Sequence, residues 1–148
     1  MKDNSACFSS NSVHWATPRK LYNAFMDHGF LDPCPLHATF DGLNIDYYNK
    51  KLYINPPFKD MDKWVDFALR QFNNGCEIMF LMPSRTDTKY FHKLCDLAPT
   101  IYFLKGRLKF NDSDKAAPFP CVIISIKQRI FKDLWFNCSV DEFICSYL

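Results

Sequence analysis

The chain has 148 residues, of which 48% are apolar and 23% are charged, the length and composition of one domain with a buried core. Its seven cysteines form no C-x-x-C pair and its four histidines have no metal-ligand spacing, which argues against a disulfide scaffold and against a metal site. The four glycines are isolated, so the glycine-rich loops of dehydrogenases and P-loop kinases are absent, and the formal charge of +2 gives only a weak overall field.

The sequence also predicts a location. No apolar run reaches the ~18 residues that a membrane span needs, and residues 1–15 are polar where a secretory signal would be apolar. We therefore expect a single domain over residues 1–148, in a reducing cytoplasm and without membrane contact.

The first predicted element is a helix that ends at Gly29. We expect Thr17 to be its N-cap and Pro18 its first helical residue. Residues 30–31 then predict a short strand, which the prolines that follow must end. Asp32 is therefore expected at the carboxyl end of that strand.

Strand and helix patterns alternate along the rest of the chain. They predict an α/β fold whose sheet is mostly parallel, flanked by helices, and ends in an antiparallel hairpin turned at Lys105 and Gly106. The predicted elements are a strand over 52–54, an amphipathic helix over 61–72, a strand over 77–82, a helix near 90–94 capped at Thr86 or Asp87, strands over 101–104, 107–110 and 121–126, and a last helix opened by a capping box at Ser139 and Glu142.

The segment Asn55-Pro56-Pro57-Phe58 lies at a strand end, where ligands of open α/β sheets bind. Two consecutive prolines make a stiff turn that presents carbonyls without competing N–H donors. Asn55 Oδ1 and the Pro56 carbonyl can accept both hydrogens of an exocyclic amine, while Phe58 offers a flat face to an extruded base. Acceptors in this arrangement favour the pyramidal nitrogen that attacks an electrophilic methyl group. On its own, the tetrapeptide is also what a proline-stabilised turn would require.

A set of sequence blocks follows in order along residues 15–126, and together they resemble the phage DNA N-6-adenine-methyltransferase family, a Dam-like group of S-adenosylmethionine-dependent enzymes. The resemblance implies a compact Rossmann-like methyltransferase fold with no separate target-recognition domain, and a phage or prophage origin, hence the host-cell cytoplasm. The blocks are WATP at 15–18, FLDPCP at 30–35, DGL at 41–43, YINPPF at 53–58 with Trp64 downstream, LMPSRTDT at 81–88, KGRLKF at 105–110 and APFP at 117–120.

The resemblance also implies roles for individual residues. Asn55 and the Pro56 carbonyl would hold the amine, and Phe58 would stack on the flipped base. Asp32 would contact the ammonium of S-adenosylmethionine, and Asp41, or alternatively Asp46, its ribose or adenine. The implied base pocket is Asn55, Pro56, Pro57 and Phe58; the implied cofactor residues are Asp32, Pro33, Asp41, Asn55, and Thr17 and Pro18 at the methionine end.

Two departures from larger adenine methyltransferases stand out. Only 22 residues separate Asp32 from Asn55, and residues 36–40 hold no glycine-rich turn, so we expect an abbreviated cofactor pocket. Phe58 stands where tyrosine is commoner, which keeps the stacking face. We expect Trp64 and the other aromatic residues at helical spacing to belong to the core.

A basic segment indicates a nucleic-acid partner. Between residues 105 and 132, seven lysines and arginines are accompanied by two aspartates and interleaved with Phe110 and Phe119. Such a segment is typical of an edge that contacts DNA phosphates, and a solvated hairpin face is the alternative. The candidate DNA-binding residues are Arg85, which follows a strand end, and Lys105, Arg107 and Lys109.

We therefore expect transfer of a methyl group from S-adenosylmethionine to N6 of adenine in DNA. Cytosine N4 and a protein glutamine amide are alternative acceptors, and the basic segment argues against the glutamine. The alternative from another class is a non-catalytic nucleic-acid-binding protein with a degenerate methyltransferase fold. The presence of Thr17, Asp32 and an intact NPPF segment favours the enzyme.

Overall fold

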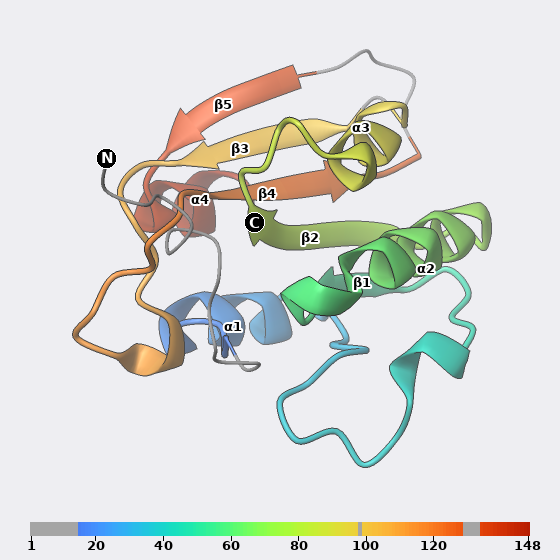
Figure 1. Cartoon of the computed structure of the whole chain (residues 1–148). Helices are drawn as coiled ribbons and strands as arrows, with labels where there is room; N and C mark the ends of the chain where they lie inside the picture. Colours follow the sequence, from blue (N-terminus) through green and yellow to red (C-terminus); the bar gives the residue numbers. More distant parts are fainter. Residues whose placement is uncertain (1–14, 98, 129–133) are drawn as a thin grey trace, which may run out of the picture.

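Five strands form one open sheet in the order β1-β2-β4-β3-β5 in the computed structural model, which describes residues 15–97, 99–128 and 134–148 (Figure 1). The α/β class predicted from the sequence is confirmed. The elements are α1 (Arg19–Asp27), η2 (Gly42–Asn44), β1 (Lys51–Ile54), η3 (Phe58–Asp60), α2 (Met61–Asn73), β2 (Glu77–Pro83), α3 (Lys89–Cys95), β3 (Thr100–Leu104), η4 (Phe110–Asp112), β4 (Cys121–Ile126), β5 (Leu134–Cys138) and α4 (Val140–Ser146), where η marks a short 3-10 helix.

The sheet is mixed, so the prediction of a mostly parallel sheet is wrong. β1 pairs with β2 and β3 with β5 in parallel, whereas β4 lies antiparallel between β2 and β3. The reason is the connection from β3 to β4: residues 105–120 stay at the sheet edge where β3 ends, so the chain re-enters the sheet in the opposite direction. The carboxyl ends of β1, β2, β3 and β5 consequently share one edge with the start of β4, on the left in Figure 1.

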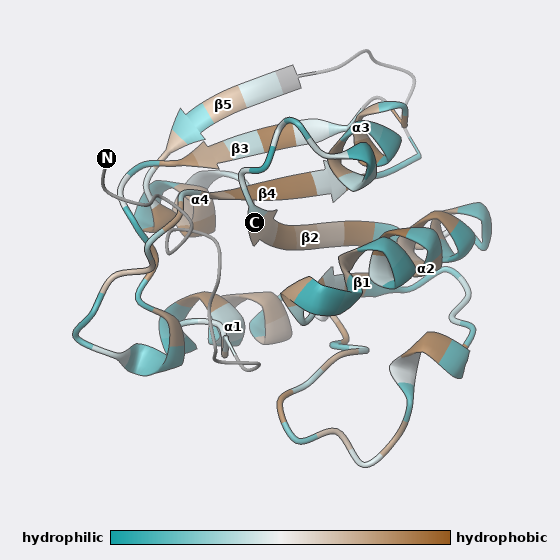
Figure 2. Ribbon diagram, in the orientation of Figure 1, coloured by the Kyte–Doolittle hydropathy of each residue, from teal (hydrophilic) through white to brown (hydrophobic). Residues whose placement is uncertain are grey.

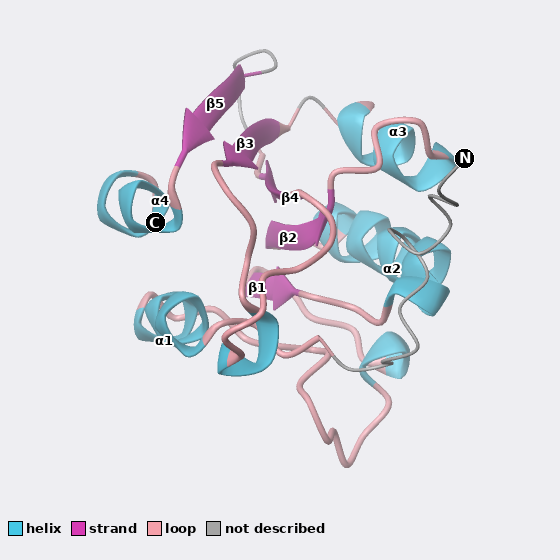
Figure 3. Cartoon of the chain, turned by 60° about the vertical axis from the view of Figure 1, so that its left-hand side comes forward, coloured by secondary structure: helices cyan, strands magenta, loops and turns pink. Residues whose placement is uncertain are grey.

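Helices cover both faces of this sheet. In Figure 3, α1 and α4 lie on one side of the strands and α2 and α3 on the other. In β2, Met79 and Leu81 pack toward α1 and α4, whereas Ile78 and Phe80 pack toward α2 and α3. Because both faces are buried, β2 and β4 are apolar at nearly every position, as the brown central strands of Figure 2 show.

The predicted hairpin is also wrong. Residues 107–110 form no strand and lead into η4, after a turn in which Gly106 has φ +77°. Leu108 and Phe110 are buried while Arg107 and Lys109 are exposed, so the alternation comes from packing and not from a ladder. β3 pairs instead with β5, which the sequence did not reveal: this edge strand is short, and its Trp135 is 68% exposed.

Smaller differences concern element ends. Residues 30–31 form only an isolated parallel bridge, Leu31 with Leu52, but this bridge still places Asp32 beside the carboxyl end of β1. The N-cap of α1 is Pro18 and not Thr17, whose hydroxyl contacts Tyr53 instead. The N-cap of α3 is Thr88, neither of the two predicted residues. The capping box of α4, formed by Ser139 and Glu142, is confirmed, and the helix and strands predicted over 61–72, 52–54, 77–82, 101–104 and 121–126 are present.

None of the helices in the described part of the chain is long and apolar enough to cross a membrane.

A close backbone contact shapes the loop that follows Asp32. A Cβ atom built on Gly42 would lie 1.7 Å from the Pro33 carbonyl oxygen and 3.2 Å from the Trp64 ring. Only glycine therefore lets η2 pack against the turn at Pro33. This contact folds residues 33–41 back over the carboxyl end of β1.

We expect Gly42→Ala to lower the free energy of unfolding by about 1–3 kcal/mol, because the added methyl group must displace the Pro33 backbone. Urea unfolding followed by circular dichroism measures the change. Ala116→Ser is the control, because Ala116 is exposed and lies outside any described helix or strand. Its free energy of unfolding should stay within about 0.5 kcal/mol of that of the original chain. An unchanged unfolding midpoint for Gly42→Ala would contradict the contact.

Candidate functional site

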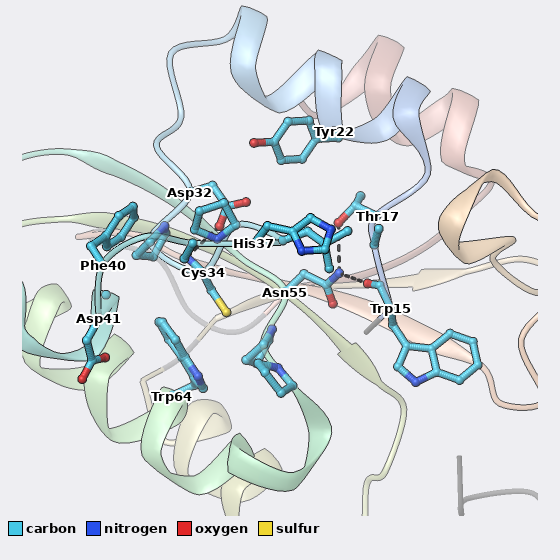
Figure 4. Close-up of a pocket in the computed structure, with 18 of the residues that line it drawn as sticks. Trp15, Thr17, Tyr22, Asp32, Cys34, His37, Phe40, Asp41, Asn55 and Trp64 are labelled. Carbon is cyan, nitrogen blue, oxygen red and sulfur yellow. Dashed lines mark hydrogen bonds between the residues drawn. The ribbon is translucent and has the colours of Figure 1, made fainter. Parts of the chain in front are cut away.

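A cavity of about 650 Å³ opens at the carboxyl edge of the sheet, within the usual size range of small-molecule sites (Figure 4). Three stretches of chain supply most of its wall: residues 15–17 and 19 before and at the start of α1, residues 32–38 and 40–42 after the Leu31 bridge, and residues 55–57 after β1. The wall includes the following residues that were predicted for the site from the sequence: Thr17, Asp32, Pro33, Asp41, Asn55, Pro56 and Pro57.

The amide of Asn55 is held in one orientation. Its Nδ2 atom donates to the Trp15 carbonyl at 2.7 Å and to Thr17 Oγ1 at 3.0 Å. Its Oδ1 atom is buried and has no hydrogen-bond partner among the described residues. A buried acceptor without a donor costs about 1–3 kcal/mol, so this oxygen is suited to a donor that arrives with a ligand.

Asp32 is a carboxylate in an apolar surrounding. Burial raises its pKa to about 6. Hydrogen bonds from the Cys34 N–H, at 2.8 Å, and from the Tyr22 hydroxyl lower the pKa and so oppose this shift. Within the described ranges, no lysine or arginine forms an ion pair with it. A positively charged ligand group would stabilise its ionised form, so the Asp32 carboxylate fits an ammonium.

The structure separates the two aspartates that the sequence left as alternatives. Asp41 lines the cavity and caps η2 by accepting from Leu43 N and Asn44 Nδ2. Asp46 does not line it, and its carboxylate accepts from Arg70 at 2.9 Å. Of the two aspartates, Asp41 is therefore the one that lines the cavity.

Two residues of the predicted site lie outside the cavity wall. Pro18 begins α1 beside Thr17, and Phe58 follows the wall residue Pro57. The half-buried Phe58 ring lies nearly parallel to that of Trp15, with centroids 6.1 Å apart and an interplanar angle of 17°, and meets the edge of Phe119. Phe58 thus belongs to an aromatic cluster that includes the wall residue Trp15.

Sequence reasoning missed several wall residues. Trp64 was expected only in the core; it is buried there, yet it also lines the cavity. Tyr22 and Phe40 have no signal in the sequence, because their roles depend on how α1 and the 33–41 loop pack. Only its place in the FLDPCP block at 30–35 pointed to a ligand contact for Cys34. Burial, with the nearby Asp32, raises the pKa of its thiol to about 12, so the thiol stays neutral.

The candidate DNA-binding residues all follow strand ends at the same edge as the cavity. Arg85 pairs with Asp87 at 3.4 Å and Lys105 with Glu142 at 3.4 Å. Arg107 and Lys109 are exposed, and neither has an ion-pair partner in the described ranges. The basic residues Arg129 and Lys132 lie outside the described residues.

No group of three or more histidine, cysteine, aspartate or glutamate side chains in the described part of the chain is placed to hold a metal ion. The polar groups of the cavity wall include hydrogen-bond acceptors, namely single carboxylates, an amide oxygen and proline carbonyls, and such acceptors match a ligand that carries an ammonium or an amine.

Comparison with known proteins identifies a family. A family model described as DNA N-6-adenine-methyltransferase (Dam) matches residues 4–131. No curated protein and no solved structure matches the chain. Because the family match extends over most of its length, the chain belongs to the DNA N-6-adenine-methyltransferase (Dam) family.

Proposed function

We propose that the chain is an enzyme that methylates N6 of adenine in DNA, with S-adenosylmethionine as the methyl donor. The observation that carries this proposal is the Asn55 amide, whose nitrogen is committed to Trp15 and Thr17 and whose buried oxygen has no donor among the described residues. Membership of the Dam family supports both the reaction and the DNA substrate.

In this proposal the two hydrogens of the adenine amine bond to Asn55 Oδ1 and to the Pro56 carbonyl. These acceptors draw the nitrogen out of conjugation with the ring, so that its lone pair points at the methyl group. When bound, S-adenosylmethionine supplies that methyl group on a positively charged sulfur. The new N–C bond forms as the S–C bond breaks, and the surplus proton leaves the nitrogen afterwards. The base itself stacks on Phe58, which follows the wall residue Pro57.

The chain's own residues fit the cofactor. Asp32 receives the ammonium, Asp41 the hydroxyls of the ribose, and the Thr17 side of the cavity lies against the methionine end. Four of the five strands run in the same direction and the cavity lies at their carboxyl ends, which supports an abbreviated Rossmann-like methyltransferase fold.

The same edge supplies the DNA contact. Exposed Arg107 and Lys109, which have no ion-pair partner among the described residues, are the strongest candidates for phosphate binding. Arg85 and Lys105 are available after exchange of their exposed aspartate and glutamate partners, since such surface pairs contribute little.

Asn55→Ala should lower kcat by at least about 100-fold with little change in cofactor affinity, because it removes one of the two acceptors of the amine. The measurement is incubation with unmethylated DNA and S-adenosylmethionine, digestion to nucleosides and mass spectrometry. Asn137→Ala, on exposed β5, is the matched control. N4-methyldeoxycytidine as the product would overturn the choice of base, and no methylated nucleoside from the folded original chain would overturn the reaction.

Cofactor affinity should fall as the pH is lowered from 7 to 5, because a proton competes with the ammonium for Asp32, whose pKa lies at about 6 without ligand. Asp32→Asn should bind the cofactor more weakly at pH 7 and without this pH dependence. Titration calorimetry at several pH values measures both effects. Equal affinity of the two chains at pH 7 would remove Asp32 from the cofactor site.

A ligand-free control tests the same carboxyl. Asp32 binds its proton more tightly in the folded than in the unfolded chain, so its contribution to the free energy of unfolding falls as the pH rises from about 4 to about 6. Asp32→Asn should therefore be more stable than the original chain at pH 7, whereas Asp27→Asn, exposed on α1, should not.

Neutralising Arg107 and Lys109 should weaken DNA binding and lower the slope of log affinity against log salt by about 1 for each residue. Fluorescence anisotropy with a labelled duplex over a range of salt concentrations gives the slope. Lys50→Ala, before β1 at the opposite edge of the sheet, should leave it unchanged. If the Arg107→Ala/Lys109→Ala chain had the same slope as the original chain, these two residues would be part of a solvated surface without DNA contact.

A further inference from the structure

A chain of hydrogen bonds leads from the core to the Asn55 amide. Tyr53, fully buried on β1, has its hydroxyl 2.6 Å from Thr17 Oγ1, and Thr17 Oγ1 in turn accepts from Asn55 Nδ2 at 3.0 Å. The Tyr53 ring is stacked on Phe25 with centroids 4.1 Å apart and an interplanar angle of 20°. This series of hydrogen bonds therefore starts from Tyr53, a side chain that packing holds in place.

The Trp15 carbonyl decides which way round the amide lies. A carbonyl oxygen can only accept a hydrogen bond, so the group 2.7 Å from it must be the nitrogen of Asn55. The reversed amide would set two acceptors against each other there. Thr17 Oγ1, as the second acceptor, occupies the other amide hydrogen and leaves Oδ1 as the group without a partner among the described residues.

The segment that carries these acceptors is itself fixed. Ala16 N donates to Asn111 Oδ1 at 2.9 Å, and Asn111 N donates to the Ala16 carbonyl at 2.8 Å. Arg19 N donates to Asp112 at 2.9 Å. Asn111 and Asp112 have φ values of +58° and +48°, an uncommon conformation for residues other than glycine, which the paired hydrogen bonds offset.

We propose that Thr17 and Tyr53 are positioning residues for methyl transfer: through their hydroxyl groups they hold the Asn55 amide so that Oδ1, and not Nδ2, meets the amine of the target base. This inference rests on the proposed function. It assigns Thr17 a role that acts through Asn55, beyond a place along the cofactor, and it gives Tyr53, which lies outside the cavity wall, a part in the reaction.

The inference predicts a specific pattern of kinetics. Thr17→Val keeps the shape of the side chain and removes the hydroxyl, so kcat should fall about tenfold, the effect of one hydrogen bond, while cofactor affinity stays within about twofold. Thr17→Ser keeps the hydroxyl and should restore kcat. Tyr53→Phe should lower kcat less than Thr17→Val, because the Asn55 to Thr17 bond remains. Thr86→Val and Tyr48→Phe, both at exposed positions, are the matched controls.

Three results would overturn the inference. Weaker cofactor binding with unchanged kcat in Thr17→Val would make Thr17 a cofactor contact alone. Equal losses in Thr17→Ser and Thr17→Val would point to packing of the methyl group. Unchanged kcat and cofactor affinity in both Thr17→Val and Tyr53→Phe would leave the hydroxyls without a role.

A measurement without substrate separates this inference from the proposed function. In the cofactor-free chain labelled with ¹⁵N-asparagine, both side-chain amide protons of Asn55 are hydrogen-bonded, so they should exchange slowly with solvent. Thr17→Val should speed exchange of one of them, and Thr17→Ser should not. If no DNA methylation is detected but this pattern holds, the hydrogen-bonded arrangement stands and the proposed reaction fails. If methylation is detected and exchange does not respond to Thr17→Val, the positioning role fails.

Discussion

The site depends on the pairing of the Asn55 amide with a backbone carbonyl that lies 40 residues earlier in the chain. Because that carbonyl cannot donate, the nitrogen of the amide faces the segment before α1 and the oxygen is left for a ligand. The other features serve this pairing: the Leu31 bridge and β1 bring Asn55 to the edge of the sheet, and Asn111 holds the segment that carries Trp15. A polar group left unpaired in a buried place is costly, and in the proposed function the amine of the substrate supplies the hydrogen bond that folding leaves unmade.

The cavity joins two electrostatic environments that suit opposite partners. At Asp32, burial disfavours the charged carboxylate, and a cation reverses that penalty. At Asn55 and Pro56 the acceptors are neutral, and in the proposed function they would bind the hydrogens of the amine without placing a charge beside the reacting nitrogen. Outside the cavity, the cationic side chains of residues 105–109 face solvent. In the proposed function, a positively charged cofactor and a polyanion would therefore contact different parts of one edge of the sheet, and neither part would repel its partner.

Most of the fold follows from patterns in the sequence. The helices α1, α2 and α4 and the strands β1 to β4 follow from apolar spacing and from capping residues, and the segments around Asp32 and Asn55 follow from prolines that end strands. The predictions that are wrong concern features that depend on contacts between residues far apart in the sequence. Thr17 has the features of an N-cap, but Tyr53 competes for its hydroxyl. Residues 107–110 alternate as a strand does, yet they alternate because Leu108 and Phe110 reach into the core. The order of the strands, and hence the antiparallel direction of β4, leaves no local signal in the sequence. The same holds for the contact between the Tyr22 hydroxyl and Asp32.

The connection from β3 to β4 has a consequence for how such an enzyme can change. It leaves and re-enters the sheet at one edge, so lengthening it disturbs no strand pair and costs little closure entropy. Hydrogen bonds hold it at the Leu108 carbonyl, bonded to Ala117 N, at Asn111, bonded to Ala16, and at Asp112, bonded to Arg19 N. In the proposed function, insertions before Leu108 or around residues 113–116 would therefore alter the surface offered to DNA while the acceptors around the reacting amine stay where they are. In this fold, preference for a target sequence and competence for the reaction can diverge independently.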